Sequence, residues 1–157
     1  MDIKNLHKAK KNKADEFYTL YKDIENEIKG NYDSQLENKI VLMNCNDGFD
    51  SNFWSYFHQN FSYHKLKKII GISYQNDKSA CKIEYTGGND ANIYDACITK
   101  LSRNGNFSSK ESTEILKGAD LVVTNPPFSL FRDYINHIVE HKKDFIEMVE
   151  GVKSIKI

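Results

Sequence analysis

The chain has 157 residues, a length that suits one domain with a buried core. Hydrophobic residues make up 39% and charged residues 28%, and the formal net charge is +0, so the composition is that of a globular protein with no global sign of a nucleic-acid partner. No apolar run approaches the roughly 20 residues that cross a bilayer, and the N-terminus lacks the apolar core of a signal peptide. Three scattered cysteines without metal or disulfide spacing complete the prediction of a cytoplasmic protein with reduced thiols and no membrane partner.

The chain begins with a basic arm. Lysines crowd residues 1–13, where they either meet phosphates or form a solvated, frayed terminus. Residues 14–29 then carry Phe17, Tyr21, Ile24 and Ile28 at helical spacing, which predicts an amphipathic helix. The breaker cluster at 30–34 ends it.

A strand, a turn, a helix and a second strand follow. Residues 39–44 form a continuous apolar run typical of a buried parallel strand, and the polar turn 45–50 comes directly after it. Ser51 is a suitable N-cap for the next helix, whose aromatic face carries Trp54, Phe57 and Phe61. Residues 68–74 repeat the apolar pattern, so the whole segment is predicted to be a βαβ unit with a right-handed crossover.

The middle of the chain is less regular. Residues 80–86 alternate as a strand does, 87–90 form a turn, and 93–101 fit a short strand or a helix equally well. Ser108 and Glu111 have the spacing of a capping box, which predicts a short helix over 109–117 with Gly118 at its C-terminal end.

Asn125-Pro126-Pro127-Phe128 ends an apolar, β-branched run that reads as a buried strand. Proline disfavours the α region for the residue before it, so the tip of this strand is held extended. Open α/β sheets place their ligands at the carboxyl ends of their strands, and here an amide and an aromatic ring stand at that edge. The pattern favours a binding site over a plain turn. A helix with a buried stripe follows, made by Phe131, Ile135, Ile138 and Val139.

A competing metal motif lies on that helix. His137 and Glu140-His141 match an H-x-x-E-H pattern, and two histidines four residues apart can share a zinc ion. On a helical wheel both histidines lie opposite Ile135 and Ile138, on the face predicted to meet solvent. A third ligand well downstream is missing as well, so no metal site is expected.

The ordered set of motifs resembles the EcoRI-type adenine-specific DNA methylases, and the similarity spans about residues 6–145. It rests on four segments: 15–19 (Asp-Glu-Phe-Tyr-Thr), 44–47 (Asn-Cys-Asn-Asp), 87–90 (Gly-Gly-Asn-Asp) and 119–132, which contains the Asn-Pro-Pro-Phe motif. The resemblance implies an α/β, Rossmann-like sheet of the S-adenosylmethionine-dependent methyltransferases, incomplete at this length. It also implies S-adenosylmethionine as cofactor and double-stranded DNA as partner.

The same resemblance implies catalytic roles for Asn125, Pro126, Pro127 and Phe128. The Asn125 side-chain oxygen and the Pro126 carbonyl would accept the two N6 hydrogens of adenine, so that its nitrogen moves towards a tetrahedral geometry. Positioning and preorganised electrostatics would then supply most of the acceleration of methyl transfer. Phe128 would stack on the adenine, which must be flipped out of the duplex.

Cofactor-binding roles are implied for seven residues: Phe17, Tyr18, Asn44, Asn46, Asp47, Asn106 and Phe107. The turn around Asn46 and Asp47 would hold the amino-acid part of the cofactor, and the segment with Phe17 and Tyr18 would close over it. The chain departs from the family at three places. Its first turn lacks a glycine-rich loop, its second strand lacks a terminal acid for the ribose, and Asn106 stands where an aspartate is usual.

Length is the largest departure, because such methylases continue well past this point. Glu147 and Glu150 are expected to interrupt the next buried strand. We therefore expect three parts: a basic arm (1–13), a partial catalytic domain (14–146) and a divergent tail (147–157), with a complementing C-terminal chain as a partner. The first alternative is a non-catalytic or partner-dependent remnant. The lesser alternative is a methyltransferase that acts on RNA or on protein glutamine.

Overall fold

A computed structural model describes residues 19–45, 48–73, 79–125, 130–149 and 153–156. Among these residues, none of the helices is long and apolar enough to cross a membrane. The helices are α2 (Tyr21–Ile28), α3 (Asp33–Leu36), a 3-10 turn (Gly48–Asp50), α4 (Asn52–Gln59), α5 (Lys110–Lys117) and α6 (Phe131–Glu140). The strands are β1 (Ile40–Asn44), β2 (Lys68–Ile72), β3 (Cys81–Tyr85), β4 (Cys97–Lys100), β5 (Leu121–Thr124), β6 (Asp144–Val149) and β7 (Lys153–Lys156).

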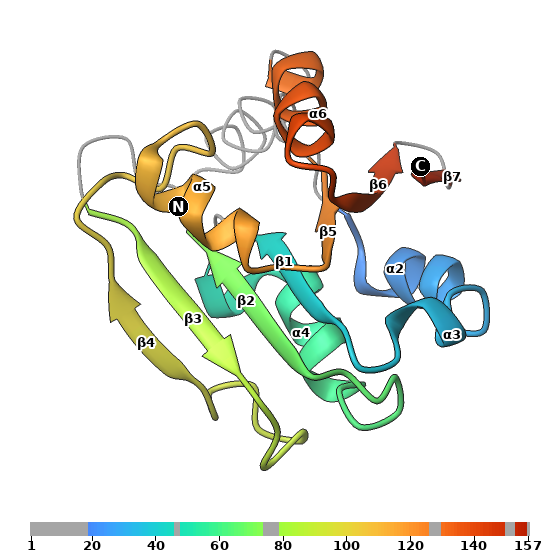
Figure 1. The fold of residues 1–157 in the computed structure, drawn as a ribbon. Helices are drawn as coiled ribbons and strands as arrows, with labels where there is room; N and C mark the ends of the chain where they lie inside the picture. The colour runs from blue at the N-terminus through green and yellow to red at the C-terminus, as the bar shows by residue number, and fades with distance from the viewer. Residues whose placement is uncertain (1–18, 46–47, 74–78, 126–129, 150–152, 157) are drawn as a thin grey trace, which may run out of the picture.

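The described strands form one open, twisted sheet in the order β4-β3-β2-β1-β5-β6-β7. Its centre is parallel: β1 pairs with β2 and β5, and β5 pairs with β6. The hairpin of β3 and β4 extends one side, and because β3 is antiparallel to both neighbours, β4 again runs in the direction of β1. In Figure 1 the arrowheads of β1, β2 and β4 accordingly point the same way. The carboxyl ends of β1, β2, β4 and β5 therefore share one edge of the sheet.

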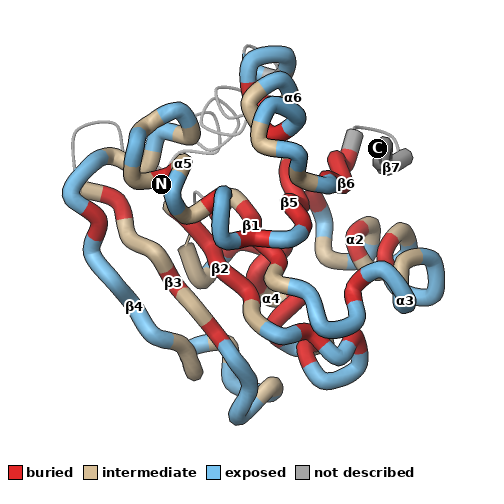
Figure 2. The backbone as a smooth tube through the Cα atoms, in the orientation of Figure 1, coloured by how far each residue is buried: buried red, intermediate tan, exposed pale blue. Residues whose placement is uncertain are grey.

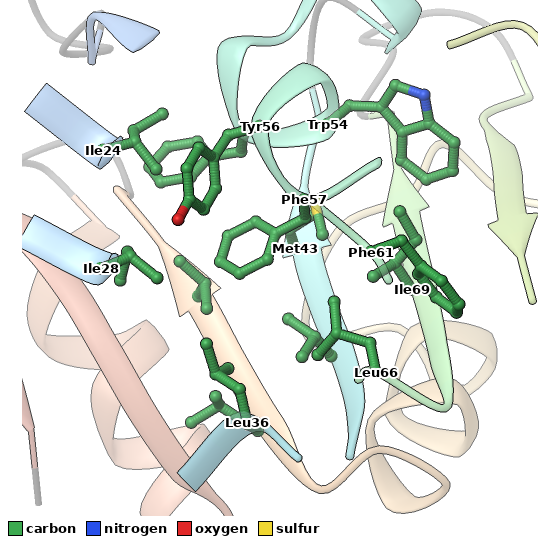
Figure 3. Packing of buried hydrophobic residues seen from close by; sticks show 14 of the residues in the cluster. Ile24, Ile28, Leu36, Met43, Trp54, Tyr56, Phe57, Phe61, Leu66 and Ile69 are labelled. Atoms are coloured by element: carbon green, nitrogen blue, oxygen red, sulfur yellow. The ribbon is translucent and has the colours of Figure 1, made fainter. Parts of the chain in front are cut away.

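Two hydrophobic layers cover the sheet. On one face α2, α3 and α4 pack against it, and Figure 3 shows aromatic side chains of α4, Trp54, Tyr56 and Phe57, gathered with Ile24, Ile28 and Met43. On the other face Leu116 of α5 and two residues of α6, Tyr134 and Ile138, meet the opposite side chains of the same strands. The α/β fold class expected from the sequence is confirmed.

Most predicted elements lie where the pattern placed them. The βαβ unit is present with parallel strands, and the strand before Asn125 is buried at all four positions. Of the helix predicted over 14–29, the described part runs over Tyr21–Ile28. Residues 93–101, which fitted a strand or a helix, contain β4, an exposed edge strand. In α6, Ile138 is buried and Ile135 packs against the core as predicted, whereas Val139 is 50% exposed and Tyr134, which was not predicted, is buried.

The expected interruption after residue 146 is wrong. β6 continues through Glu147, which is 2% exposed and pairs in register with Thr124. Burial raises the pKa of Glu147 to about 7, so the carboxyl in the sheet is neutral below that pH and about half ionised at it. The predicted boundary between 146 and 147 therefore falls inside a strand.

Candidate functional site

Asn125 stands at the carboxyl end of β5, in the centre of the sheet. The start of this strand is fixed to β1 by Asp120, whose carboxylate accepts a hydrogen bond from the Ile40 backbone N–H at 2.9 Å. The strand is then buried to its end, so the first polar side chain to emerge is that of Asn125, which is half-buried. The remaining predicted catalytic residues, Pro126, Pro127 and Phe128, lie outside the described residues.

The segment before α2 reaches this end of the sheet. The Asn125 side-chain Nδ2 donates to Thr19 Oγ1 at 2.8 Å, across 106 residues of sequence. Thr19 is buried, and its carbonyl accepts a hydrogen bond from Asn52 Nδ2 at the start of α4, at 3.0 Å. Thr19 is thus held between the tip of β5 and α4. The two residues before it, Phe17 and Tyr18, carried a cofactor prediction and are outside the described part of the chain.

A polar cluster lies on the other side of the same edge. Asn44, at the end of β1, donates from Nδ2 to Thr124 Oγ1 at 3.4 Å. The Tyr134 hydroxyl of α6 hydrogen-bonds to both Asn44 and Thr124, and burial raises its pKa to about 12. The phenol therefore stays neutral at physiological pH and fixes the rotamers of the two strand-end side chains. The other two residues predicted for this turn, Asn46 and Asp47, are outside the described residues.

The loop after β4 crosses the edge to reach this cluster. Gly105 lies against the end of β2, with φ of +83°, and a Cβ there would stand 2.6 Å from the Ser73 carbonyl oxygen. Only glycine permits this approach. Two residues further on, the Phe107 ring meets Tyr134 and His137 edge-on, with centroids 4.9 and 5.6 Å away. The loop thus places Phe107, which carries a predicted cofactor role, beside the polar cluster.

Asn106 is engaged within the loop. Its Oδ1 accepts from the Ser108 backbone N–H at 3.0 Å and from the Ser108 hydroxyl at 2.8 Å. A carbonyl oxygen has two lone pairs, so both are taken. A cofactor contact through this oxygen would require the loss of one Ser108 bond.

A small pocket opens between these parts. Its wall combines strand ends, the loop and both covering helices, and it includes Asn44, Gly105, Phe107, Ser112, Tyr134 and His137. The Ser112 hydroxyl of α5 is buried and has no hydrogen-bond partner within the described residues. The cavity is small, about 20 Å³, which is room for about one water molecule, and it combines an aromatic wall with a few converging polar groups, one of them unsatisfied.

Three of these wall residues were not predicted from the sequence as site residues: Ser112, Tyr134 and His137. Ser112 and Tyr134 belong to no motif. His137 was placed on the solvent face, and this is wrong: it is half-buried, with Nε2 lying 3.2 Å from Thr113 Oγ1 of α5. Burial and the neighbouring His141 lower the pKa of His137. Within the described part of the chain, no three His, Cys, Asp or Glu side chains are grouped so as to hold a metal ion.

An open α/β sheet whose parallel strands end in polar side chains has the layout of a cofactor-binding protein. Within that class, the chain belongs to the family described as adenine-specific methyltransferase EcoRI, whose model matches residues 5–156. No solved structure was found to match the chain.

Three curated relatives are type II methyltransferases. The chain is 46% identical to M.MgeORF184P of Mycoplasma genitalium, 42% identical to M.EcoRI of Escherichia coli and 40% identical to M.MpnI of Mycoplasma pneumoniae. The alignments cover 90%, 97% and 90% of this chain, but 43%, 50% and 42% of the relatives. The chain thus spans about half the length of the curated relatives that it matches.

Proposed function

We propose that the chain carries the catalytic half of a DNA methyltransferase that methylates the exocyclic N6 of adenine. The observation that carries this proposal is the position of Asn125. Its amide stands at the carboxyl end of β5 and its nitrogen is held by Thr19, in a segment that the family match covers. Because Thr19 holds the amide nitrogen, the amide oxygen is fixed in direction as well.

The chain's own residues would act by positioning. The adenine N6 lone pair is delocalised into the ring, so the nitrogen is a poor nucleophile until both of its hydrogens are bound. In this proposal the Asn125 Oδ1 and the Pro126 carbonyl accept those two hydrogens, and Phe128 stacks on the flipped base. S-adenosylmethionine, when bound, supplies a methyl group on a positively charged sulfur.

For the cofactor we propose the edge between β1, the loop after β4 and the segment before α2. In this proposal Asn44, Phe107 and the Ser112 hydroxyl supply the aromatic and polar contacts. Phe17, Tyr18, Asn46, Asp47 and Asn106 remain proposed contacts on the strength of the family resemblance.

The test is methyl transfer from isotopically labelled S-adenosylmethionine to duplex DNA, followed by nucleoside analysis. We expect N6-methyladenine with the wild-type chain, its loss in Asn125→Ala, and its retention in the matched control Asn136→Ala, an exposed asparagine on α6. If the labelled methyl group is found instead in RNA or in protein glutamine, that acceptor is the substrate and the DNA proposal is wrong. No labelled product with any acceptor would contradict it for this chain alone.

A second candidate, a partner-dependent or non-catalytic remnant, is favoured by the coverage of about half of each relative. To distinguish the two candidates, a separately expressed C-terminal part of a relative is added to the methyl-transfer assay. Activity that appears only in the mixture identifies partner dependence. Cofactor binding by calorimetry with no methyl transfer in the mixture identifies a remnant.

A further inference from the structure

A groove lined by positive side chains lies beside the edge strand β4. Its walls come from β3, the end of β4, the loop that follows and the first two turns of α5, and its cations are Lys82, Lys100, Arg103 and Lys110. We call this surface the β4 groove. All four residues of β4 are exposed, and Figure 2 shows the strand as an uncovered margin of the sheet.

Two acids also line the groove, yet both are engaged. Glu111 accepts hydrogen bonds from the Ser102 backbone N–H and hydroxyl, both at 3.0 Å, and from the Arg103 backbone N–H at 3.2 Å. These bonds, the Ser102 backbone bond foremost, lower the pKa of Glu111. Glu114 pairs with Lys117 at 3.2 Å. Glu111 therefore braces the loop from behind and keeps its negative charge, so the groove sets four cations against two acids and is positive on balance.

The cations are mostly unpaired. Lys82 pairs with Glu84 at 3.0 Å. Lys100, Arg103 and Lys110 make no ion pair within the described part of the chain. A protein of formal net charge +0 thus places a local excess of positive charge, four cations against two acids, on one groove.

The β4 groove and Asn125 lie on the same edge of the sheet. β4 runs parallel to β1 and β5, so its carboxyl end, where Lys100 stands, faces the same way as theirs. Four strand spacings of about 4.8 Å separate β5 from β4, or about 19 Å in all. A duplex carries one phosphate charge per about 1.7 Å of its axis and turns once in about 34 Å, so one duplex lying along this edge reaches both places within about half a turn.

One continuous segment joins the two places. The Ala80 N–H donates to the Arg103 carbonyl at 2.7 Å, which fixes the groove end of the loop to β3. Gly105 then passes the end of β2, and Phe107 reaches Tyr134 beside the strand ends of the candidate site. The groove is therefore held at a fixed distance from the site by packed backbone.

We propose that the β4 groove binds the phosphate backbone of duplex DNA on one side of the adenine that occupies the site. This rests on the proposed function only for the position of the adenine. Lys100, Arg103 and Lys110 contact phosphates, so they add affinity without reading sequence.

The experiment measures binding of a fluorescein-labelled duplex to the whole chain by anisotropy over a range of salt concentrations. The test variant is Lys100→Gln/Arg103→Gln/Lys110→Gln. The matched control is Lys39→Gln/Lys65→Gln/Lys67→Gln, an equal loss of charge at exposed residues on the opposite edge of the sheet. Each lost phosphate contact lowers the slope of log affinity against log salt by about 0.9, so we expect the slope to fall by up to about 2.7 in the test variant. The control keeps the wild-type slope.

Equal slopes in the test variant and the wild type, an equal fall in the control, or absence of binding by the wild-type chain would each overturn the proposal. Circular dichroism melts of all three proteins exclude unfolding as the cause. Asn125→Ala separates this proposal from the previous one: it abolishes methyl transfer and leaves the salt slope unchanged. A groove effect without methyl transfer would support the surface and contradict the catalytic proposal.

Discussion

The contact between Thr19 and Asn125 determines which end of an amide faces the ligand. An asparagine amide can turn by 180° about its last bond and exchange its oxygen and nitrogen. Thr19 Oγ1 engages the nitrogen at 2.8 Å, so the oxygen is directed elsewhere. Thr19 itself cannot move freely, because its carbonyl is bound by Asn52. The segment before α2 thus orients a side chain that lies 106 residues further along the chain but next to it in space.

Replacing Thr19 by valine should therefore slow methyl transfer without removing the cofactor site. The variant keeps the shape of the side chain and loses one hydrogen bond, worth about 1 kcal/mol or somewhat more, so we expect kcat to fall about tenfold. KM for S-adenosylmethionine should change little. Thr19→Ser keeps the hydroxyl and should restore kcat in the same steady-state assay. Equal losses in the valine and serine variants would show that the hydroxyl does not act on Asn125.

At this scale the sequence predicts strand-end residues better than pocket walls. Asn44 and Asn125 were predictable because an apolar run ends abruptly at each of them. Ser112 and His137 were not, because their burial arises where α5, α6 and the loop at Phe107 pack together. Helical periodicity locates the apolar face of α6, but the neighbour that covers the polar side near His137 comes from another part of the chain.

Among the secondary-structure elements, the loop between β4 and α5 is the most constrained. It crosses the end of β2 at Gly105, where a Cβ would also stand 2.8 Å from the Ala80 Cβ. Further along, its end is anchored where the Ser109 hydroxyl accepts a hydrogen bond from the Ser112 N–H at the start of α5. Glu111, predicted to complete the cap with Ser108, binds Ser102 instead.

Gly105→Ala should accordingly destabilise the protein more than a glycine replacement in open space. Gly30 is the matched control, since its φ is +84° against +83° and no atom lies within 4 Å of its added Cβ. Both variants place an L side chain at the same positive φ, and only Gly105→Ala adds a clash with backbone and core. We expect its free energy of unfolding in urea to be lower than that of Gly30→Ala by about 1–3 kcal/mol. Equal losses would mean that the loop moves aside without cost.

The strands show which elements a pattern can identify. β1, β2 and β5 are buried on both faces, so each appears as a continuous apolar run. β4 is exposed at every position and has no apolar signature, which is why 93–101 fitted two structures. β6 was misjudged because a buried glutamate is rare in a strand, and the pattern cannot show that burial raises the pKa of Glu147.

For the molecule as a whole, Glu147 links stability to pH. Its pKa is about 7 in the folded protein and 4.5 in the reference state, so between these values the folded state holds the proton more tightly than the unfolded state does. The free energy of unfolding should therefore fall as pH rises from about 4.5 to about 7, by up to about 3 kcal/mol from this group, and level off above.

Glu147→Gln removes the titration and should flatten the pH dependence within that window. Urea unfolding at a series of pH values measures it. Exposed Glu140→Gln, at the end of α6, is the matched control and should keep the wild-type dependence. An unchanged curve in Glu147→Gln would show that the carboxyl is ionised in the folded protein.

The strand order also determines when each strand can pair while the chain is being synthesised. β1 needs Asp120, 80 residues further on, before its second edge is paired. At 5–20 residues per second, a ribosome takes about 4–16 s to add that length. β2 can pair with β1 much earlier, and β3 with β4 across the loop 86–96. For several seconds of each synthesis, the newborn chain thus presents one bare, apolar strand edge, and this is the interval in which it most needs protection from pairing with a wrong partner.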